Sequence, residues 1–473
     1  MRVEELLSRS ARQYPGKAAV ICNGRRYSYE WVYDEATRRA TSLSRNGVQP
    51  GSRVGICLEN SIDAIVWMFA VAIARATFFI LSPQMRPDRL KAIETDAGAT
   101  AMIVVGQVRR AEQAVRADLP DEDLAAIVYT SGSTGTPKGV MLTHANLCAA
   151  ATSITTYLKN TADDVIFSAL PLSFTYGLGQ VTTAFLSGAT LVLARSVAYP
   201  RTVLDTLAQE QVTGLPLVPT MATLLVRHGL AQQRLPSLRY ITNAAAALSE
   251  DKVRQLRQAV PRAEIFSMYG QTECQRATFL NPELLGMHPT SVGRAIPGAT
   301  VAVVNEHGND LPPGLTGELV VRGPQVMRGY WNQPDATAQA LRRRPDGEQW
   351  LFTGDLFRQD ADGLLYFVER RDALIKSRGE KVAPRAVEEV IARLPGVADV
   401  GVYGIPDELL GHAVAAAVTL EPGASLTPLE VQRHCLVHLE SYMVPKVIEI
   451  RASLPTTTTG KINRAALLQE AAS

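Results

Sequence analysis

The chain has 473 residues, of which 46% are hydrophobic and 20% are charged, and its formal net charge is +2. A chain of this length is expected to form about two or three domains, and its balanced charge favours neither a nucleic-acid groove nor a polybasic membrane face. Its five cysteines are scattered without a CxxC pair. This usage predicts a reducing, cytoplasmic compartment and neither a disulfide framework nor a zinc ribbon.

Two segments bear on membrane association. The N-terminal sequence MRVEELLSRSARQYPGK mixes both charge signs and lacks the apolar core of a signal peptide. The most apolar stretch covers only residues 64–74, whereas a membrane span needs about twenty residues. A buried helix is therefore predicted here, and no membrane span is expected.

The sequence HCLVH at 434–438 places two histidines one helical turn apart. No glutamate follows the first histidine and no third ligand is obvious, so an amphipathic helix is predicted rather than a metal site.

From residue 53 onward, short β-branched and apolar runs alternate with helical periods. Such alternation predicts an α/β fold whose parallel strands are buried on both faces by helices. Strands are expected at 53–58, 76–81, 99–105, 125–130, 165–170, 189–194, 212–218, 238–244 and 264–270.

The character of the chain changes at about Gly298. A strand–turn–strand pattern follows, punctuated by HGND and PPG, which predicts an antiparallel β-rich module over about 298–371. The last hundred or so residues mix strands and helices. The expected organisation is thus a large multi-layer α/β domain at 1–371 and a small α+β domain at 372–473, with the charged stretch ERRD (369–372) as candidate hinge.

The sequence YTSGSTGTPKGV (129–140) is unlike the rest of the chain. Glycines let backbone N–H groups approach a ligand closely, hydroxyls donate to oxyanions, and one lysine supplies a point charge. The segment follows a predicted strand and precedes a helix that begins near His144, where α/β folds bind phosphates. It matches neither a P-loop nor G-x-G-x-x-G. Its candidate phosphate ligands are Thr130, Ser131, Gly132, Ser133, Thr134, Gly135 and Lys138.

This loop resembles the phosphate-binding signature of the adenylate-forming superfamily, which comprises acyl-CoA synthetases, adenylation domains of peptide synthetases and firefly luciferase. The resemblance continues in order along nearly the whole chain. The later segments that carry it are SMYGQTE (267–273), GELVVRGPQVMRGYWN (317–332), TGDL (353–356), IKSRGEKVAP (375–384) and LPTTTTGKINRAAL (454–467).

The resemblance implies an AMP-forming carboxylic acid–thiol ligase with ATP and Mg²⁺ as cofactors. A small carboxylic acid attacks the α-phosphate of ATP and gives an acyl-adenylate and pyrophosphate. A phosphopantetheine thiol, belonging to CoA or to an acyl or peptidyl carrier protein, then takes the acyl group and releases AMP.

The resemblance also implies roles for individual residues. The loop from Thr130 to Gly135 and Lys138 would bind the β- and γ-phosphates. Thr272 and Glu273 would act in catalysis, with Glu273 holding Mg²⁺. The remaining nucleotide contacts would be Tyr269 stacked on adenine, the adjoining Gly270, Asp355 on the ribose hydroxyls, Phe367 on adenine and Arg370 on ribose or phosphate.

The C-terminal domain carries the catalytic lysine of the superfamily, which matches Lys461. That residue would bridge the substrate carboxylate and the α-phosphate, and would leave when the domain swings about a hinge matched by Asp372. The loop at Gly379 would then form part of the thiol tunnel. One departure from the superfamily pattern is Glu369, which stands where glycine usually precedes the arginine matched by Arg370.

The acyl pocket is expected to include Phe174, Thr175, Gly179, Pro216, Met268 and Arg276. Amino-acid-activating domains carry Phe followed by Asp at 174–175, and that Asp pairs with the substrate ammonium. Here Thr175 takes its place, and an unpaired buried ammonium is costly. An ordinary α-amino acid is therefore disfavoured, although the surrounding segment LPLSFTYGLGQ (170–180) resembles that of free-standing prolyl-type adenylation enzymes. Arg276 could face a second substrate carboxylate, but a structural ion pair is the favoured interpretation.

Three alternatives remain open from the sequence. The chain could be an amino-acid adenylation enzyme that loads a carrier protein, a luciferase-like enzyme that oxidises its adenylate, or a non-catalytic nucleotide-binding module. Retention of both Lys138 and Lys461 argues against the last of these.

Overall fold

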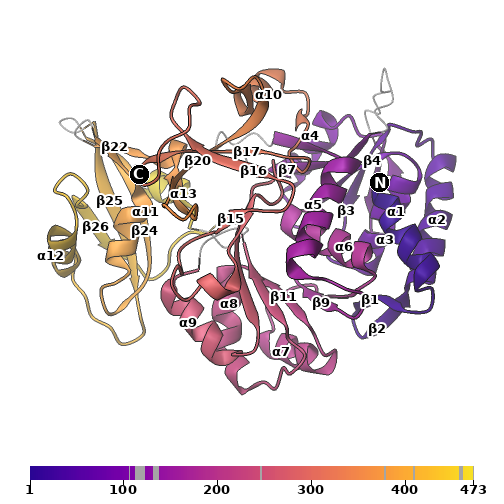
Figure 1. The fold of residues 1–473 in the computed structure, drawn as a ribbon, viewed down its shortest axis with the longest axis horizontal. Coiled ribbons are helices and arrows are strands. Elements are labelled where there is room, and N and C mark those ends of the chain that lie inside the picture. The colour runs from indigo at the N-terminus through magenta and orange to yellow at the C-terminus, as the bar shows by residue number, and fades with distance from the viewer. Residues whose placement is uncertain are drawn as a thin grey trace. The chain divides into compact units, whose positions relative to one another are not determined.

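The computed structural model describes residues 1–105, 107–111, 123–130, 138–244, 248–377, 380–407, 411–456 and 462–471. The chain divides into two compact units. The first comprises Met1–Ala302 and Val320–Thr353, and the second comprises Val303–Leu319 and Gly354–Ser473. Figure 1 shows the elements along the chain.

The larger sheet of the first unit has nine strands among the described residues, in the order β15-β14-β13-β12-β11-β9-β10-β1-β2. The pairs from β1 through β10, β9, β11 and β12 to β13 are parallel, as the sequence predicts. The strands are β1 (Ala18–Cys22), β2 (Arg25–Ser28), β9 (Val165–Ser168), β10 (Thr190–Leu193), β11 (Gly214–Leu217), β12 (Tyr240–Asn243), β13 (Glu264–Tyr269), β14 (Thr278–Phe279) and β15 (Arg294–Ala295).

A second sheet in this unit has the order β18-β8-β7-β4-β3-β5-β6. Its central strands β3 and β4 are buried at every position, because β-branched and aromatic side chains fill both faces. The strands are β3 (Arg53–Cys57), β4 (Thr77–Leu81), β5 (Ala101–Val104), β6 (Gln107–Arg110), β7 (Leu124–Thr130), β8 (Lys138–Thr143) and β18 (Gly329–Tyr330).

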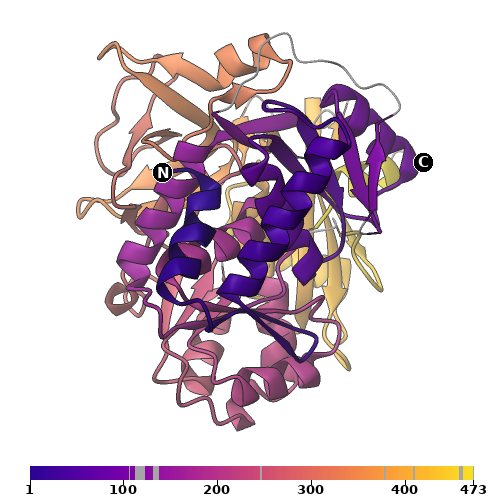
Figure 2. The same ribbon diagram turned by 90° about the vertical axis from the view of Figure 1, so that its right-hand side faces the viewer.

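The helices of the first unit cover these sheets. Helix α3 is buried from Ala64 to Ala72, which confirms the predicted buried helix, and it packs against α1 and α2 (Figure 2). Helix α8 packs against α7 and α9 (Figure 1). The helices are α1 (Val3–Gln13), α2 (Tyr29–Arg45), α3 (Ile62–Ile73), α4 (Pro87–Asp96), α5 (His144–Leu158), α6 (Thr175–Ser187), α7 (Pro200–Gln209), α8 (Pro219–Arg227), α9 (Glu250–Ala259) and α10 (Pro334–Ala340), with 3₁₀ turns η1 (Leu230–Gln232) and η2 (Pro282–Leu284).

The helix predicted near His144 begins there as α5, but the sequence did not predict the strand that precedes it. Residues 138–143 form strand β8, which pairs antiparallel with β7. The apolar and β-branched sequence GVMLT suits a strand, and α5 begins only at His144. The loop therefore connects the two strands of a hairpin.

A β-rich module follows, with the order β16-β17-β20-β19 and β21 beside β20. Strand β20 pairs antiparallel with both β19 and β21, in agreement with the expected module. The strands are β16 (Thr300–Val304), β17 (Thr316–Arg322), β19 (Leu341–Arg343), β20 (Gln349–Gln359) and β21 (Leu365–Arg370).

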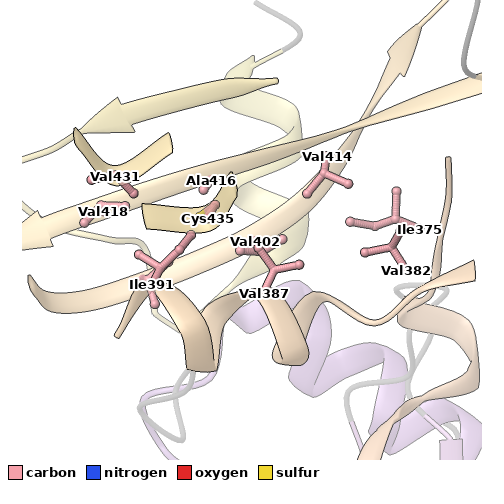
Figure 3. Packing of buried hydrophobic residues seen from close by; sticks show 11 residues of the cluster. Ile375, Val382, Val387, Ile391, Val402, Val414, Ala416, Val418, Val431 and Cys435 are labelled. Carbon is pink, nitrogen blue, oxygen red and sulfur yellow. The ribbon is translucent and has the colours of Figure 1, made fainter. Parts of the chain in front are cut away.

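The C-terminal part of the second unit is a sheet of order β23-β22-β25-β24, with β26 beside β25, packed against helices. Its core joins Val387 and Ile391 of α11, Val402 of β24, Val414 of β25 and Cys435 of α12 (Figure 3). The elements are η3 (Arg371–Ala373), β22 (Ile375–Ser377), β23 (Glu380–Val382), α11 (Pro384–Ile391), β24 (Val397–Asp407), β25 (Gly411–Leu420), α12 (Pro428–His438), β26 (Val447–Ile450) and α13 (Arg464–Ala471).

The histidines of HCLVH lie on α12, as predicted for a helix. The His434 Nε2 atom lies 3.0 Å from the Val390 carbonyl, and His438 Nδ1 lies 2.9 Å from the His434 carbonyl. Among the helices of the described ranges, none is both long and apolar enough to cross a bilayer.

A buried histidine ties the N-terminal helix to the start of α5. The Val3 N–H lies 3.0 Å from His144 Nδ1, and the Arg2 guanidinium lies 2.9 Å from Nε2. Burial and the charge of Arg2 lower the pKa of His144 to about 3, although Glu4 lies 3.6 Å from Nδ1. The imidazole is therefore neutral in the folded protein.

This burial predicts a loss of stability in mild acid. Below the ordinary histidine pKa of about 6.5, the unfolded chain binds a proton that folded His144 does not, so the stability contribution falls as pH decreases, by about 2 kcal/mol at pH 5. Urea unfolding of wild type and His144→Gln at pH 7 and pH 5 measures this. The variant should lose less stability between the two pH values, and equal losses would contradict the assignment.

Candidate active site

The phosphate-loop hairpin is fixed at both of its ends. Thr130 ends β7 opposite Lys138, which begins β8, and the Thr130 hydroxyl donates to the Lys138 carbonyl at 3.4 Å. Position 139, which follows Lys138, must be glycine, because a Cβ there would lie 2.8 Å from Ile127 Cγ2. The predicted ligands Ser131, Gly132, Ser133, Thr134 and Gly135 lie outside the described residues.

Asp96, at the end of α4, contacts both this hairpin and Trp331, which directly follows the neighbouring strand β18. Its carboxylate accepts a hydrogen bond from the Tyr129 hydroxyl at 2.7 Å, and its carbonyl accepts from the Trp331 indole at 2.9 Å. Burial and the hydrogen bond to Asp96 raise the pKa of Tyr129, so its hydroxyl stays a donor. Trp331 also donates its backbone N–H to the Gly139 carbonyl at 2.7 Å.

Tyr330 connects two of the predicted site residues. It lies on β18, opposite Val140 of β8. The Lys138 ammonium stands over the Tyr330 ring, 5.3 Å from its centroid, and the Tyr330 hydroxyl donates to Glu273 Oε1 at 2.8 Å. Lys138 and Glu273, which are far apart in the sequence, therefore share one aromatic neighbour.

Sequence reasoning missed this role of Tyr330. The residue falls inside the segment 317–332 that carries the resemblance, but nothing in that segment indicates that it contacts Glu273 and Lys138.

The other predicted residues of the segment 267–273 follow the end of β13. A Cβ on Gly270 would lie 2.4 Å from the Gln275 carbonyl oxygen, so only glycine fits this close turn. The Glu273 carbonyl accepts from the Met327 N–H at 2.7 Å, which holds the turn against the segment that precedes β18. Tyr269, Thr272 and Glu273 are each half-buried. Polar groups thus gather at the carboxyl end of a buried strand, where α/β folds bind ligands.

The second unit pairs the predicted ribose-binding residues. Asp355 and Arg370 face each other across β20 and β21, with Oδ1 and Nη1 3.2 Å apart. Asp355 is buried and Arg370 is half-exposed. Phe367 packs edge-on against Phe357, and the Arg385 guanidinium lies 5.0 Å from the Phe367 ring centroid.

Glu369, the departure from the superfamily pattern, is 2% exposed and well satisfied. Its carboxylate accepts from the backbone N–H groups of Arg370 at 2.9 Å and Arg385 at 2.8 Å, and it pairs with Arg464 at 3.4 Å. Burial lowers the pKa of Arg464, but the charges of Glu388 and Glu369 outweigh this and raise it. Glu369 thus ties β21 to α11 and α13.

Of the three residues predicted in the C-terminal region, only Asp372 lies within the described ranges. The backbone of Asp372 lies in η3, directly after β21. Gly379 and Lys461 lie outside the described residues.

The predicted acyl-pocket residues all lie in the first unit. Phe174 precedes α6 and Thr175 begins it. A Cβ built on Gly179 would meet no atom within 4 Å, so open space lies beside this position. Pro216 is buried in β11. Met268 of β13 accepts from the Tyr157 hydroxyl, which lies 3.0 Å from its sulfur, and Arg276 is buried in the turn that precedes β14.

The family with the description "AMP-binding enzyme" matches residues 7–119 and 110–331, and "AMP-binding enzyme C-terminal domain" matches residues 386–461. Together with the fold, these matches define an adenylate-forming enzyme. The chain belongs to the AMP-binding enzyme family, and the resemblance inferred from its motifs is confirmed.

Relatives match over nearly the whole chain. Indoleacetate–CoA ligase of Aromatoleum aromaticum is 31% identical over 98% of this chain and 97% of its own length. A linear gramicidin synthase of Brevibacillus parabrevis is 29% identical over 98% of this chain, which matches 10% of that longer protein. The structure of ATP-bound MatB from Rhodopseudomonas palustris has a TM-score of 0.89 and 28% identity over 99% of both chains. The chain is an AMP-forming acid–thiol ligase that uses ATP.

The Tyr330 bridge predicts a measurable effect on ATP binding. Tyr330→Phe keeps the ring under Lys138 but removes the hydrogen bond to Glu273, and a bond to a charged group contributes about 1.5–3 kcal/mol. Titration calorimetry with ATP and Mg²⁺ should show affinity reduced by about tenfold or more. A matched control is Tyr366→Phe, which removes a tyrosine–carboxylate bond to Asp360 in the second unit. An ATP affinity no weaker than that of the control would contradict the bridging role.

Proposed function

We propose that this chain activates a small carboxylic acid with ATP and Mg²⁺, and transfers the acyl group to the phosphopantetheine thiol of CoA or of a carrier protein. The observation that carries the proposal is the arrangement of Lys138, Tyr330 and Glu273 beside the phosphate-loop hairpin. It provides a cation and a carboxylate next to a loop rich in N–H and hydroxyl donors. The family and the indoleacetate–CoA ligase relative support the acid and the thiol.

Adenylation requires charge neutralisation and alignment, but no nucleophile from the protein. Lys138 would neutralise charge on the β- and γ-phosphates. Glu273 offers a hard oxygen ligand of the kind Mg²⁺ prefers beside a polyphosphate, and its half-buried position and the hydrogen bond from Tyr330 would hold that carboxylate in place. The bound ion would stabilise negative charge on the phosphates. Tyr269, Asp355, Phe367 and Arg370 would bind the adenosine.

The second half-reaction would use the C-terminal domain, for which we propose the range 372–473. Lys461 would bridge the acid and the α-phosphate during adenylation. Rotation at Asp372 would then withdraw it and bring the loop at Gly379 to the thiol. This alternation would let one small domain serve both half-reactions, and it accounts for an active-site lysine so far from the phosphate loop in sequence.

A second candidate function is amino-acid activation with transfer to a carrier protein, which the match to linear gramicidin synthase favours. Thr175 argues against it because it supplies no carboxylate for an ammonium group. A luciferase-like oxidation would use the same adenylate but need no thiol. The five free, buried cysteines accord with the reducing, cytoplasmic location that we propose.

The proposed function predicts exchange of labelled pyrophosphate into ATP that depends on both Mg²⁺ and a carboxylic acid. The exchange is expected because adenylation is reversible in the absence of a thiol. A broad panel of acids should contain at least one that supports it, and CoA and carrier proteins can then be compared as acceptors. If ATP binds normally but every acid fails, a nucleotide-binding module replaces the ligase.

Lys461→Ala is predicted to separate the two half-reactions. Loss of a charged group that stabilises the transition state costs about 3–4 kcal/mol, so adenylation should slow by orders of magnitude. Transfer from a preformed acyl-adenylate to the thiol should persist. Asp372→Pro, which stiffens the proposed hinge, should show the opposite bias, and equal loss of both steps in Lys461→Ala would reject the assigned role.

A further inference from the structure

Arg276 is a buried cation in the first unit. Its side chain is 5% exposed, and its Nε atom has no hydrogen-bond partner. No carboxylate within the described ranges pairs with its guanidinium, so the structural ion pair favoured by the sequence has no partner there. Burying a charge without an opposite charge costs several kcal/mol.

A second buried arginine shows how this fold satisfies a structural guanidinium. Arg53 is 4% exposed, and its side chain donates to the backbone carbonyls of Ala97 at 3.0 Å, Gly98 at 2.6 Å and Gly51 at 3.3 Å. Three carbonyls, two of them just after the end of α4, thus receive that cation. Arg276 has no comparable set of carbonyl acceptors among the residues that the structure describes.

The groups around Arg276 are aromatic. Its guanidinium lies 4.7 Å from the centroid of the Tyr176 ring. Burial raises the pKa of Tyr157, and the charge of Arg276 opposes that rise. A cation over an aromatic face gains about 2 kcal/mol when desolvated, which offsets only part of the burial cost. Burial raises the pKa of Tyr176 to about 12 despite the charge of Arg276, so this phenol stays neutral and is no counter-ion.

Both tyrosine hydroxyls also have partners other than Arg276. The Tyr176 hydroxyl lies 2.8 Å from the Thr242 hydroxyl and donates to the Thr242 carbonyl at 3.0 Å. The Tyr157 hydroxyl lies 3.0 Å from the Met268 sulfur. The two tyrosines therefore hold the guanidinium in place without neutralising it.

These contacts put the cation among the residues predicted to line the acyl pocket. Met268 is one of them, and Tyr176 directly follows Thr175 on α6. Gly179 lies one turn further along α6 beside open space. The predicted pocket residues of this region thus include one buried positive charge, at Arg276, and an uncharged hydroxyl, at Thr175.

We propose that the acid which this enzyme activates carries a second carboxylate, and that Arg276 binds it. This inference rests on the proposed function, because it concerns the acid of the same reaction. A guanidinium can hold a carboxylate through two parallel hydrogen bonds, and the low dielectric of a buried site strengthens that pairing. The same charge repels an α-ammonium group, so the pocket selects against ordinary amino acids twice, once at Arg276 and once at Thr175.

The test is pyrophosphate exchange with matched pairs of acids. Each linear or aromatic dicarboxylate is compared with two analogues. One is the monocarboxylate of the same length, and the other is the monomethyl ester of the dicarboxylate. At least one dicarboxylate should exceed its two singly charged analogues by about 100-fold or more in kcat/KM, because a site built for a polar group rejects analogues that lack it.

Variants at two positions locate the effect. Arg276→Met should remove about 100-fold or more of kcat/KM for the dicarboxylate and leave its monocarboxylate partner unchanged or improved. The same change at the exposed Arg262 is the matched control. Thr175→Asp should lower activity on the dicarboxylate by more than tenfold, because it adds a negative charge to the pocket. ATP affinity, measured for each variant, shows whether it is folded, and Arg276→Lys replaces Arg276→Met if that variant does not bind ATP.

The outcomes separate the two proposals. Preference for a monocarboxylate, an aromatic monoacid or an α-amino acid would overturn the second carboxylate while the acid-activating function stands. An Arg276→Met variant that keeps its preference for the dicarboxylate would also overturn the inference. If ATP binds but no acid of any kind supports exchange, the ligase function fails and the inference fails with it.

Discussion

The geometry of the candidate phosphate site depends on two of the hydrogen bonds that Asp96 accepts at the end of α4. One fixes Tyr129, the neighbour of Thr130, and the other fixes Trp331, the neighbour of Tyr330. The bond to the Asp96 carboxylate contributes about 1.5–3 kcal/mol and the bond to its carbonyl about 1 kcal/mol, and both support the register in which β8 lies between β7 and β18. Because that register places Lys138 over Tyr330 and Tyr330 against Glu273, the predicted phosphate and metal residues are positioned with the help of Asp96, whose two bonds here go to other residues.

The buried charges of this protein fall into two kinds. Glu369 is surrounded by two N–H donors and the Arg464 guanidinium, and Arg53 by three carbonyls, so both ions stabilise the fold locally. Removing a partner from such a set leaves a buried charge unsatisfied, which makes these positions sensitive to substitution. Arg276 differs because its described neighbours are aromatic side chains. A buried cation whose described neighbours are aromatic, unlike Glu369 and Arg53, calls for an explanation beyond the fold, and a bound anion supplies one.

Glu369 also bears on the hinge that we propose at Asp372. It stands directly before Arg370, whose guanidinium pairs with Asp355, and it reaches across to Arg385 and Arg464 beyond Asp372. Any rotation at Asp372 therefore acts on segments joined by a buried ion pair. Members of one fold carry many activities, and their differences lie in such local groups. Here, Glu369 is the departure from the superfamily pattern.

The sequence alone determined the family, the α/β class and the parallel strands, because these depend on short motifs and on local hydrophobic periodicity, and it supplied the candidate site residues. It missed strand β8, whose pairing with β7 and β18 is a non-local choice. It showed that Glu369 was unusual, but not that its partner Arg464 lies 95 residues further along the chain. The tertiary structure alone decided that Tyr330 joins Lys138 to Glu273 and that Arg276 is buried with no carboxylate paired to it among the residues described. Contacts of this kind depend on which elements pack together, and a buried charge has an energetic meaning only once its neighbours are known.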